Sequence, residues 1–119
     1  MKGNIAFIII SEFGDTLRYE QFKSVELLDY RGIDLKDEKE KEKYILDRMD
    51  DFFNENNFYN PAIKRDENHL LSHYNQEYFI EFKSDFEIIA FAYKLGEDDG
   101  KKIAYSKIKR KVVVYFSCC

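Results

Sequence analysis

The chain has 119 residues, 45% of them apolar and 17% aromatic, with one proline, five glycines and a formal net charge of −4. This length fits one domain spanning residues 1–119, and so little proline and glycine argues against a disordered or linker-rich chain. An acidic chain lacks the basic footprint that direct nucleic-acid binding requires, and no apolar run reaches the roughly 18 residues of a membrane-spanning helix.

The first element along the chain is an uncharged apolar run, NIAFIII, at residues 4–10. A short, continuous run of this kind predicts a buried strand over residues 5–10. The apolar stretch within it, residues 5–10, is shorter than the apolar region of about 7–15 residues in a secretory signal, and no small-residue cleavage site follows it, so we expect a cytoplasmic protein. After a turn signal at Gly14-Asp15, the pattern over residues 16–28 allows either a returning strand or a helix.

The longest element is predicted within residues 34–61, DLKDEKEKEKYILDRMDDFFNENNFYNP. At about 100° per residue, its apolar side chains fall within about a third of the circumference of a helix. Asp34 or Asp37 suits an N-cap, and Asn56-Asn57 suits a C-terminal stop, which predicts an amphipathic helix over about 36–56. The side chains expected in the core are those of Ile45, Met49, Phe52 and Phe53.

The second half of this helix is predicted to carry an acidic recognition surface. Asp50, Asp51 and Glu55 lie near the negative end of the helix dipole, where each costs a few tenths of a kcal/mol and where only Arg48 is close enough to compensate. An ordinary solvated face is the alternative, but local stability would favour lysines here, and acids beside aromatics suit a basic protein partner. The predicted partner-binding residues are Glu40, Asp47, Asp50, Asp51, Glu55, Phe58 and Tyr59.

From residue 76 onward the apolar period changes from 3.6 to 2, which predicts antiparallel strands over residues 76–83 and 110–116. Residues 85–95 also favour a strand, although Ser84 and Glu87 form a capping-box pattern that keeps a helix open as the alternative. The expected fold class is therefore α+β, an antiparallel β-sheet with a long amphipathic helix packed on one face.

One pattern points to an enzyme. Glu81-Phe-Lys83 in a predicted strand, with Asp66 upstream, is an arrangement that can hold a divalent metal and activate water for phosphodiester cleavage. It resembles the core pattern of the PD-(D/E)xK nucleases, although Arg65 stands where that pattern has a proline. Because charge alternation makes acid-x-lysine common on half-exposed strands, a small metal-dependent nuclease is only the alternative function, and we expect no catalytic, metal or cofactor site.

Three further features of the sequence are assigned no function. His69 and His73 are spaced as ligands on a helix, but neither a cysteine nor an acid joins them on that face. Cys118 and Cys119 are adjacent, so they cannot staple the fold. The basic strip at residues 107–111 is interpreted as a strand edge that lysines protect against edge-to-edge pairing.

The profile of the whole chain is similar to that of the immunity proteins that neutralise bacterial toxins. The shared features are small size, net acidity, an α+β pattern, many Asp, Glu, Tyr and Phe residues, and no catalytic motif. The profile resembles phage-encoded inhibitors of defence nucleases almost as well, and neither resemblance includes a family motif. Both imply a binding protein that blocks a basic partner, a toxin or a nuclease, by electrostatic and aromatic occlusion. The sequence predicts no oligomeric state.

Overall fold

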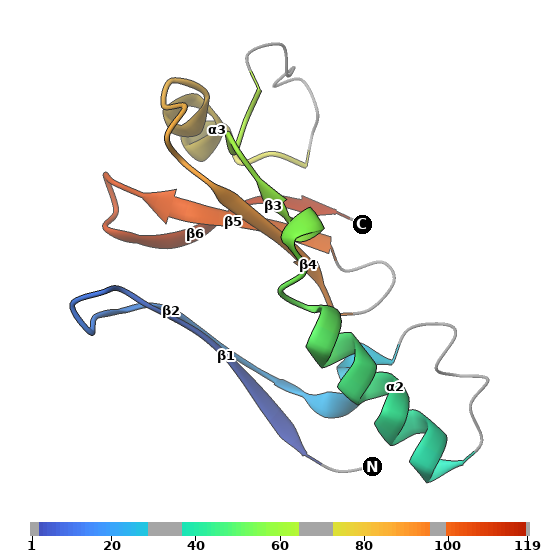
Figure 1. Cartoon of the computed structure of the whole chain (residues 1–119). Coiled ribbons are helices and arrows are strands. Elements are labelled where there is room, and N and C mark those ends of the chain that lie inside the picture. The colour runs from blue at the N-terminus through green and yellow to red at the C-terminus, as the bar shows by residue number, and fades with distance from the viewer. Residues whose placement is uncertain (1–2, 29–36, 65–72, 96–99, 119) are drawn as a thin grey trace.

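The computed structural model describes residues 3–28, 37–64, 73–95 and 100–118 of the chain. These residues form an α+β fold of two antiparallel sheets and two α-helices, which confirms the predicted fold class (Figure 1). In chain order, the strands and α-helices are β1 (Asn4–Ile10), β2 (Thr16–Lys23), α2 (Glu38–Asp51), β3 (Phe58–Tyr59), α3 (Gln76–Lys83), β4 (Ala90–Lys94), β5 (Gly100–Ser106) and β6 (Lys111–Cys118). Two short 3-10 helices, η1 (Ser24–Leu27) and η2 (Glu55–Asn57), follow β2 and α2.

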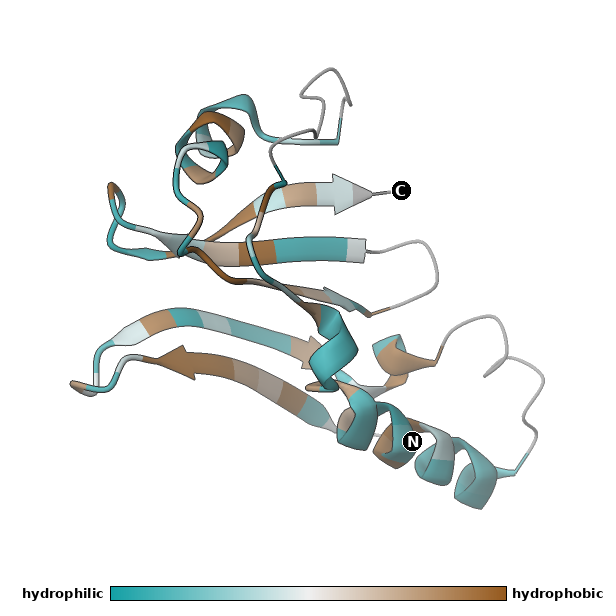
Figure 2. Ribbon diagram, turned by 45° about the horizontal axis from the view of Figure 1, so that its top comes forward, coloured by the Kyte–Doolittle hydropathy of each residue, from teal (hydrophilic) through white to brown (hydrophobic). Residues whose placement is uncertain are grey.

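The elements stack in three layers, with the four-stranded sheet in the middle (Figures 1 and 2). This sheet has the order β3-β4-β5-β6, and α3 lies against one of its faces. The β1–β2 hairpin lies against the other face, with α2 beside it. Each face therefore has its own apolar core. The α3 side is centred on Phe79, Phe82 and Tyr115, and the hairpin side on Phe7, Ile45, Phe91 and Tyr93.

The β1–β2 hairpin confirms the strand predicted over residues 5–10, but the expectation that this strand is buried is wrong, because Phe7 is the buried residue of β1. Residues 16–28, which the sequence left open, form strand β2 and then η1. In the hairpin register Ile8 lies opposite Tyr19, and both side chains are exposed, whereas Phe7 is buried against the sheet. One face of the hairpin is covered, and the outer face presents apolar side chains to solvent.

Helix α2 begins where the sequence predicts, because the side chain of Asp37 accepts a hydrogen bond from the Lys39 amide at 3.0 Å. It ends at Asp51, earlier than the predicted end near residue 56, and the chain turns into η2. Asn54 causes this stop locally, because its side chain accepts a hydrogen bond from the Asn56 amide at 2.9 Å and caps η2 instead of continuing α2.

The predicted core face of this helix is only partly buried. Ile45 is buried and Phe52 is half-buried, but Met49 is 41% exposed and Phe53 is 60% exposed, so the prediction that these two residues are core is wrong. The layer beside α2 is a hairpin of two strands, which is too narrow to cover the whole apolar arc.

Residues 76–83 form helix α3, so the strand predicted there is wrong. The side chain of Asn75 caps the helix by accepting a hydrogen bond from the Tyr78 amide at 3.3 Å. Phe79 and Phe82 are both buried, at the spacing of one helical turn. The aromatic residues that suggested a strand also satisfy this helical spacing, and the Asn75 cap favours the helix.

The strand interpretation is confirmed for the second part of residues 85–95, where β4 occupies residues 90–94. Ser84 is the C-cap of α3 rather than the start of a new helix. The strand predicted over residues 110–116 is also confirmed, because β6 occupies residues 111–118 and Arg110 turns the chain into it with a φ of 57°.

Candidate protein-binding surface

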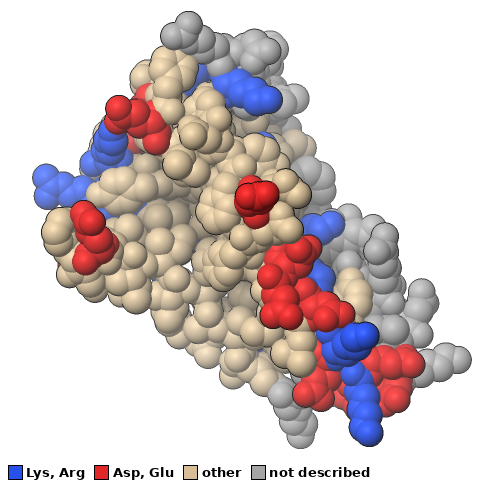
Figure 3. Space-filling model, viewed as in Figure 1, with Lys and Arg blue, Asp and Glu red and all other residues tan. Residues whose placement is uncertain are grey.

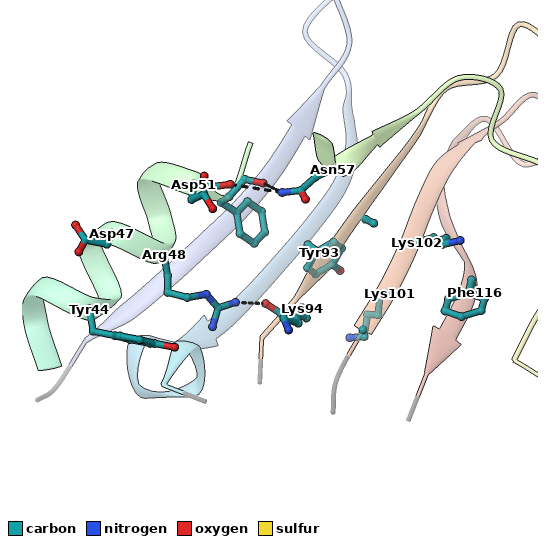
Figure 4. Close-up of a pocket in the computed structure, with 13 residues that line it drawn as sticks. Tyr44, Asp47, Arg48, Asp51, Asn57, Tyr93, Lys94, Lys101, Lys102 and Phe116 are labelled. Carbon is teal, nitrogen blue, oxygen red and sulfur yellow. Dashed lines mark hydrogen bonds between the residues drawn. The ribbon is translucent and has the colours of Figure 1, made fainter. Parts of the chain in front are cut away.

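A cleft of about 620 Å³ opens between α2 and the strands β4 and β5 (Figure 4). One wall is formed by α2, and the other by the ends of the two strands nearest the helix. The helix contributes Tyr44, Asp47 and Asp51, the strands contribute Lys94, Lys101 and Lys102, and the floor includes Phe52, Tyr93 and Phe116. The cleft is therefore lined by acids of the helix, by lysines of the strands and by aromatic side chains, with Lys101 and Lys102 on opposite faces of β5.

Arg48 anchors α2 instead of neutralising its acids. Its guanidinium donates hydrogen bonds to the carbonyl oxygens of Leu27 at 2.6 Å, Lys94 at 2.6 Å and Leu95 at 3.3 Å. These bonds fasten the helix to the end of η1 and to β4, and Figure 4 shows the bond to Lys94. The sequence indicated that Arg48 compensates the neighbouring acids, but its donors are directed at backbone carbonyls.

The structure places only some of the predicted acidic residues in the cleft. Asp47 and Asp51 line it, and Asp50 does not. At about 100° per residue Asp50 lies about 60° from Asp47, at the border of the cleft side and towards Leu46, four residues earlier. Tyr44 is on the cleft side, and the sequence analysis missed it although its spacing of three and seven residues from the two cleft acids was visible.

The acids of the helix and of η2 face solvent. In the part of the chain that the structure describes, Glu40, Asp47, Asp50 and Glu55 form no ion pair, and Asp51 accepts a hydrogen bond from the side chain of Asn54 at 3.1 Å. Figure 3 shows acidic side chains in a band over α2, with basic side chains beside them over its first half. Glu40 and Glu55 lie outside the cleft.

Phe58 and Tyr59 do not form one aromatic patch, because successive side chains of a strand point to opposite faces of the sheet. The Phe58 ring packs against Phe91 on the hairpin side, with 4.9 Å between the ring centroids. The Lys102 ammonium lies 4.9 Å from the centre of the Tyr59 ring. Through Lys102, Tyr59 borders the cleft, whereas Phe58 belongs to the opposite face.

The floor of the cleft is fixed by a hydrogen-bonded network that joins the hairpin to the sheet. The Tyr93 hydroxyl donates to Glu20, and the Arg18 guanidinium donates to Glu20 at 2.8 Å and to Tyr93 at 2.9 Å. Burial, together with the hydrogen bond to Glu20, raises the pKa of Tyr93. Burial also disfavours the Glu20 carboxylate, but the bonds from Tyr93 and Arg18 and the charge of Lys101 outweigh it and hold the pKa of Glu20 below its ordinary value. At neutral pH the Tyr93 phenol in the floor is therefore uncharged, and the Glu20 carboxylate that it contacts is ionised and paired.

Within the described residues, Glu81 and Lys83 do not form the acid–lysine pair on one strand face that the nuclease pattern requires. Glu81 and Lys83 lie on helix α3, where residues two apart point about 200° away from each other, and not on one face of a strand. Glu81 accepts hydrogen bonds from the Ser106 hydroxyl at 2.8 Å and the Lys107 amide at 3.0 Å, which hold the turn after β5. Asp66 lies outside the described residues, and within them no cluster of three metal-ligating side chains occurs.

The basic strip is a turn with partly matched charges, not a strand edge. Lys107 pairs with Asp85 at 2.8 Å, and Lys109 pairs with Glu77 at 3.6 Å. His69 and Cys119 lie outside the described residues, so the structure tests neither the histidine pair nor the pair of cysteines.

No family model, curated protein or solved structure matches this chain. Among the described residues, no helix is both long enough and apolar enough to cross a membrane. What the cleft binds is therefore inferred from its own side chains.

Proposed function

We propose that the protein is an inhibitor that binds a basic protein surface through the cleft side of α2. The observation that carries this proposal is the position of Asp47 and Asp51 on the wall of a cleft, exposed, while Arg48 is bonded to backbone carbonyls. Carboxylates in the last turns of a helix lie at its negative end and destabilise it slightly. A basic partner offsets that cost when it binds, so we assign these acids a role in binding in addition to their effect on solubility.

The shape of the cleft fits a protruding arginine or lysine side chain of the partner. A guanidinium or ammonium group between Asp47 and Asp51 would gain two charge-assisted hydrogen bonds, and the Tyr44 ring lies on the same wall. The lysines that also line the cleft repel a second cation there, so the cleft itself takes one basic side chain of the partner's surface. Tyr59 is the aromatic residue best placed at the border of this contact.

A bacterial toxin is the partner class that we assign to this surface, because the composition of the chain is similar to that of immunity proteins. A nuclease toxin fits the chemistry because its substrate site is basic, and carboxylates can occupy the positions of phosphates. Inhibition then follows from occlusion of that site. The proposal places the protein in the cytoplasm, where it meets the toxin.

A matched pair of charge reversals on one helix tests the proposal. Asp47→Lys changes the cleft wall, and Asp50→Lys makes the same change in net charge three residues away, outside the cleft. The partner is first isolated with the immobilised wild-type chain, and association of each variant is then measured by surface plasmon resonance at low and high salt. We expect Asp47→Lys to slow association about tenfold or more and to flatten its salt dependence, because like charges now face each other.

Asp50→Lys is the control for net charge, and we expect its association rate to stay within about threefold of wild type. Both substitutions place a lysine at the negative end of the helix, so neither should unfold the protein, which circular dichroism checks. Equal slowing in the two variants would show that overall charge and not the cleft recognises the partner. Wild-type rates in both would remove the acidic face from the proposal.

A further inference from the structure

The ammonium group of Lys102 lies among three aromatic rings that come from separate parts of the chain. It is 4.9 Å from the centre of the Tyr59 ring of β3, 4.8 Å from that of Phe116 of β6 and 6.0 Å from that of Tyr74, two residues before α3. A cation at these distances is attracted to the face of each ring. Lys102 therefore links a ring at one edge of the sheet to two rings at the other edge.

The register of the sheet places these groups on one face. Lys102 lies opposite Phe116 on β6 and opposite Ala92 on β4, and side chains that lie opposite each other share a face. Figure 4 shows Lys102 beside Phe116. On β4 the same face carries Ala92 and also Ala90, which pairs with Tyr59. Two methyl groups leave the space over β4 open, so a lysine of β5 reaches across one strand to a ring of β3.

Tyr59 is the member of this group that faces solvent. Its side chain is 39% exposed, whereas the Tyr74 side chain is buried. Strand β3 has only two residues and lies at the edge of the sheet, so few strand side chains flank the Tyr59 ring. An exposed ring loses rotamer freedom when a partner covers it, and this loss weakens binding unless the ring is already restrained. The contact with Lys102 provides such a restraint in the free protein.

Lys102 differs from its neighbour Lys101 in what it contacts. The Lys101 ammonium lies 3.7 Å from the Glu20 carboxylate, on the hairpin side of the sheet. The Lys102 side chain lies on the other face, and in the described part of the chain its ammonium contacts aromatic rings and forms no ion pair. Both lysines line the cleft, so each adds one positive charge to it. Of the two, Lys102 is the one that contacts a predicted partner-binding residue, Tyr59.

We infer that Lys102 is a positioning residue of the candidate protein-binding surface and holds the Tyr59 ring in the orientation that meets the partner. The inference rests on the proposed function, because that function gives Tyr59 a place in the contact. Its expected effect is opposite to that of charge alone. Removing a cation from the cleft reduces repulsion of a basic partner, so a lysine that acts only through its charge should weaken binding by its presence. A lysine that positions Tyr59 strengthens binding instead.

Lys101→Met and Lys102→Met are the matched pair that separates these two effects, because each removes one charge and keeps an unbranched side chain. Dissociation from the partner, isolated with the immobilised wild-type chain, is measured by surface plasmon resonance. We expect Lys102→Met to dissociate about fivefold faster than wild type or more, and Lys101→Met to dissociate no faster. Lys102→Arg should stay within about twofold of wild type, because a guanidinium also packs on aromatic faces. Dissociation of Lys102→Met no faster than that of Lys101→Met would overturn the inference.

A double-mutant cycle tests whether Lys102 acts through Tyr59. Tyr59→Leu alone should speed dissociation about fivefold or more, and Lys102→Met added to it should change the rate by less than about twofold further, because no ring is left to position. Circular dichroism verifies that each variant folds. If the effects of the two substitutions multiply, or if Tyr59→Leu dissociates as wild type does, Lys102 does not position Tyr59 for the partner and the inference is wrong.

The free protein gives a readout that does not depend on the partner. In its nuclear magnetic resonance spectrum we expect Overhauser contacts between the Lys102 methylene next to the ammonium group and the Tyr59 ring, kept in Lys101→Met. Their absence would overturn the inference whatever the partner is. If the contacts are present and Asp47→Lys associates as wild type does, the acidic part of the proposed function is wrong, while the Lys102 variants still decide whether Tyr59 is positioned for binding.

Discussion

The two faces of the four-stranded sheet are covered in different ways. On the α3 side the aromatic side chains of Phe79, Phe82 and Tyr115 are completely buried, and the Tyr115 hydroxyl donates to the Ala62 carbonyl at 2.9 Å. On the hairpin side Phe7 and Tyr93 are also buried, but the layer that covers them has an exposed apolar face of its own. On the α3 side the exposed apolar residue Ile80 lies on the outer side of the helix, whereas on the hairpin side apolar residues are exposed on both the hairpin and α2. We therefore expect stability to be concentrated on the first face, and the proposed recognition surface lies beside the second.

The largest expected effect tests the closed face. Phe82→Ala should lower the free energy of unfolding by about 3–5 kcal/mol, because it removes a buried ring that packs against Tyr115. Ile80 is the control on the same helix, since its side chain is 69% exposed, and Ile80→Ala should change the free energy by less than about 1 kcal/mol. Urea denaturation measures both. Similar losses in the two variants would mean that α3 is rotated relative to this structure.

A smaller effect is expected where α2 is fastened to the open side. Arg48→Met removes the hydrogen bonds to three carbonyls and should cost about 1.5–3 kcal/mol of local stability. Native-state hydrogen exchange should then speed up in α2 and leave α3 protected, because the two helices pack on opposite faces of the sheet. Arg48→Lys keeps the charge but not the planar fork, and should restore only part of the protection. Uniform acceleration along the chain would contradict the division into two faces.

The smallest expected effect concerns the link between hairpin and sheet. Because the pKa of Glu20 is lower in the folded protein than its ordinary value of 4.5, its carboxylate stabilises the fold above that value and stops doing so as the pH falls through the folded pKa. Glu20→Gln removes this contribution. The difference in unfolding free energy between wild type and Glu20→Gln should be full at pH 7 and shrink below about pH 4. A difference that is constant with pH would mean that the carboxylate is not stabilised by Tyr93 and Arg18.

Local sequence patterns were sufficient to predict a helix or a strand where one structural signal dominated. The uncharged run of β1 and the capped, charged start of α2 predicted those elements because no other structure satisfies the same residues. Residues 76–83 were assigned to a strand because they belong to a part of the chain that is rich in aromatic and β-branched residues. The deciding feature was Asn75, one residue upstream, whose side chain caps the first turn of α3. One capping residue is a weak signal in a sequence. It becomes decisive because the helix that it starts then packs against a face of the sheet.

The candidate site was predictable only in part, for a different reason. Periodicity identified the acids of α2 but not the side of the helix on which each lies relative to the sheet, which separates Asp47 and Asp51 from Asp50. The lysines at positions 94, 101 and 102 come from strands far along the chain, and only the antiparallel pairing of β4 with β5 brings them to the same cleft. Met49 and Phe53 fit a core pattern because periodicity shows which residues lie on the apolar side of the helix. It does not show how wide the layer is that covers this side.

The network at Tyr93 also has a consequence for how the protein is made. Arg18 and Tyr93, which lock the hairpin to the sheet, are 75 residues apart in sequence. A ribosome adds about 5–20 residues per second, so the apolar faces of β1 emerge several seconds before β4 is available to cover one of them. During that interval the sheet covers neither face of the NIAFIII segment. A nascent chain that exposes an apolar segment of this kind is a substrate for chaperones that bind such segments. A brief translational pause before residue 90 would lengthen the exposure, so synonymous codon changes in the segment between the hairpin and β4 should alter the soluble yield without changing one amino acid.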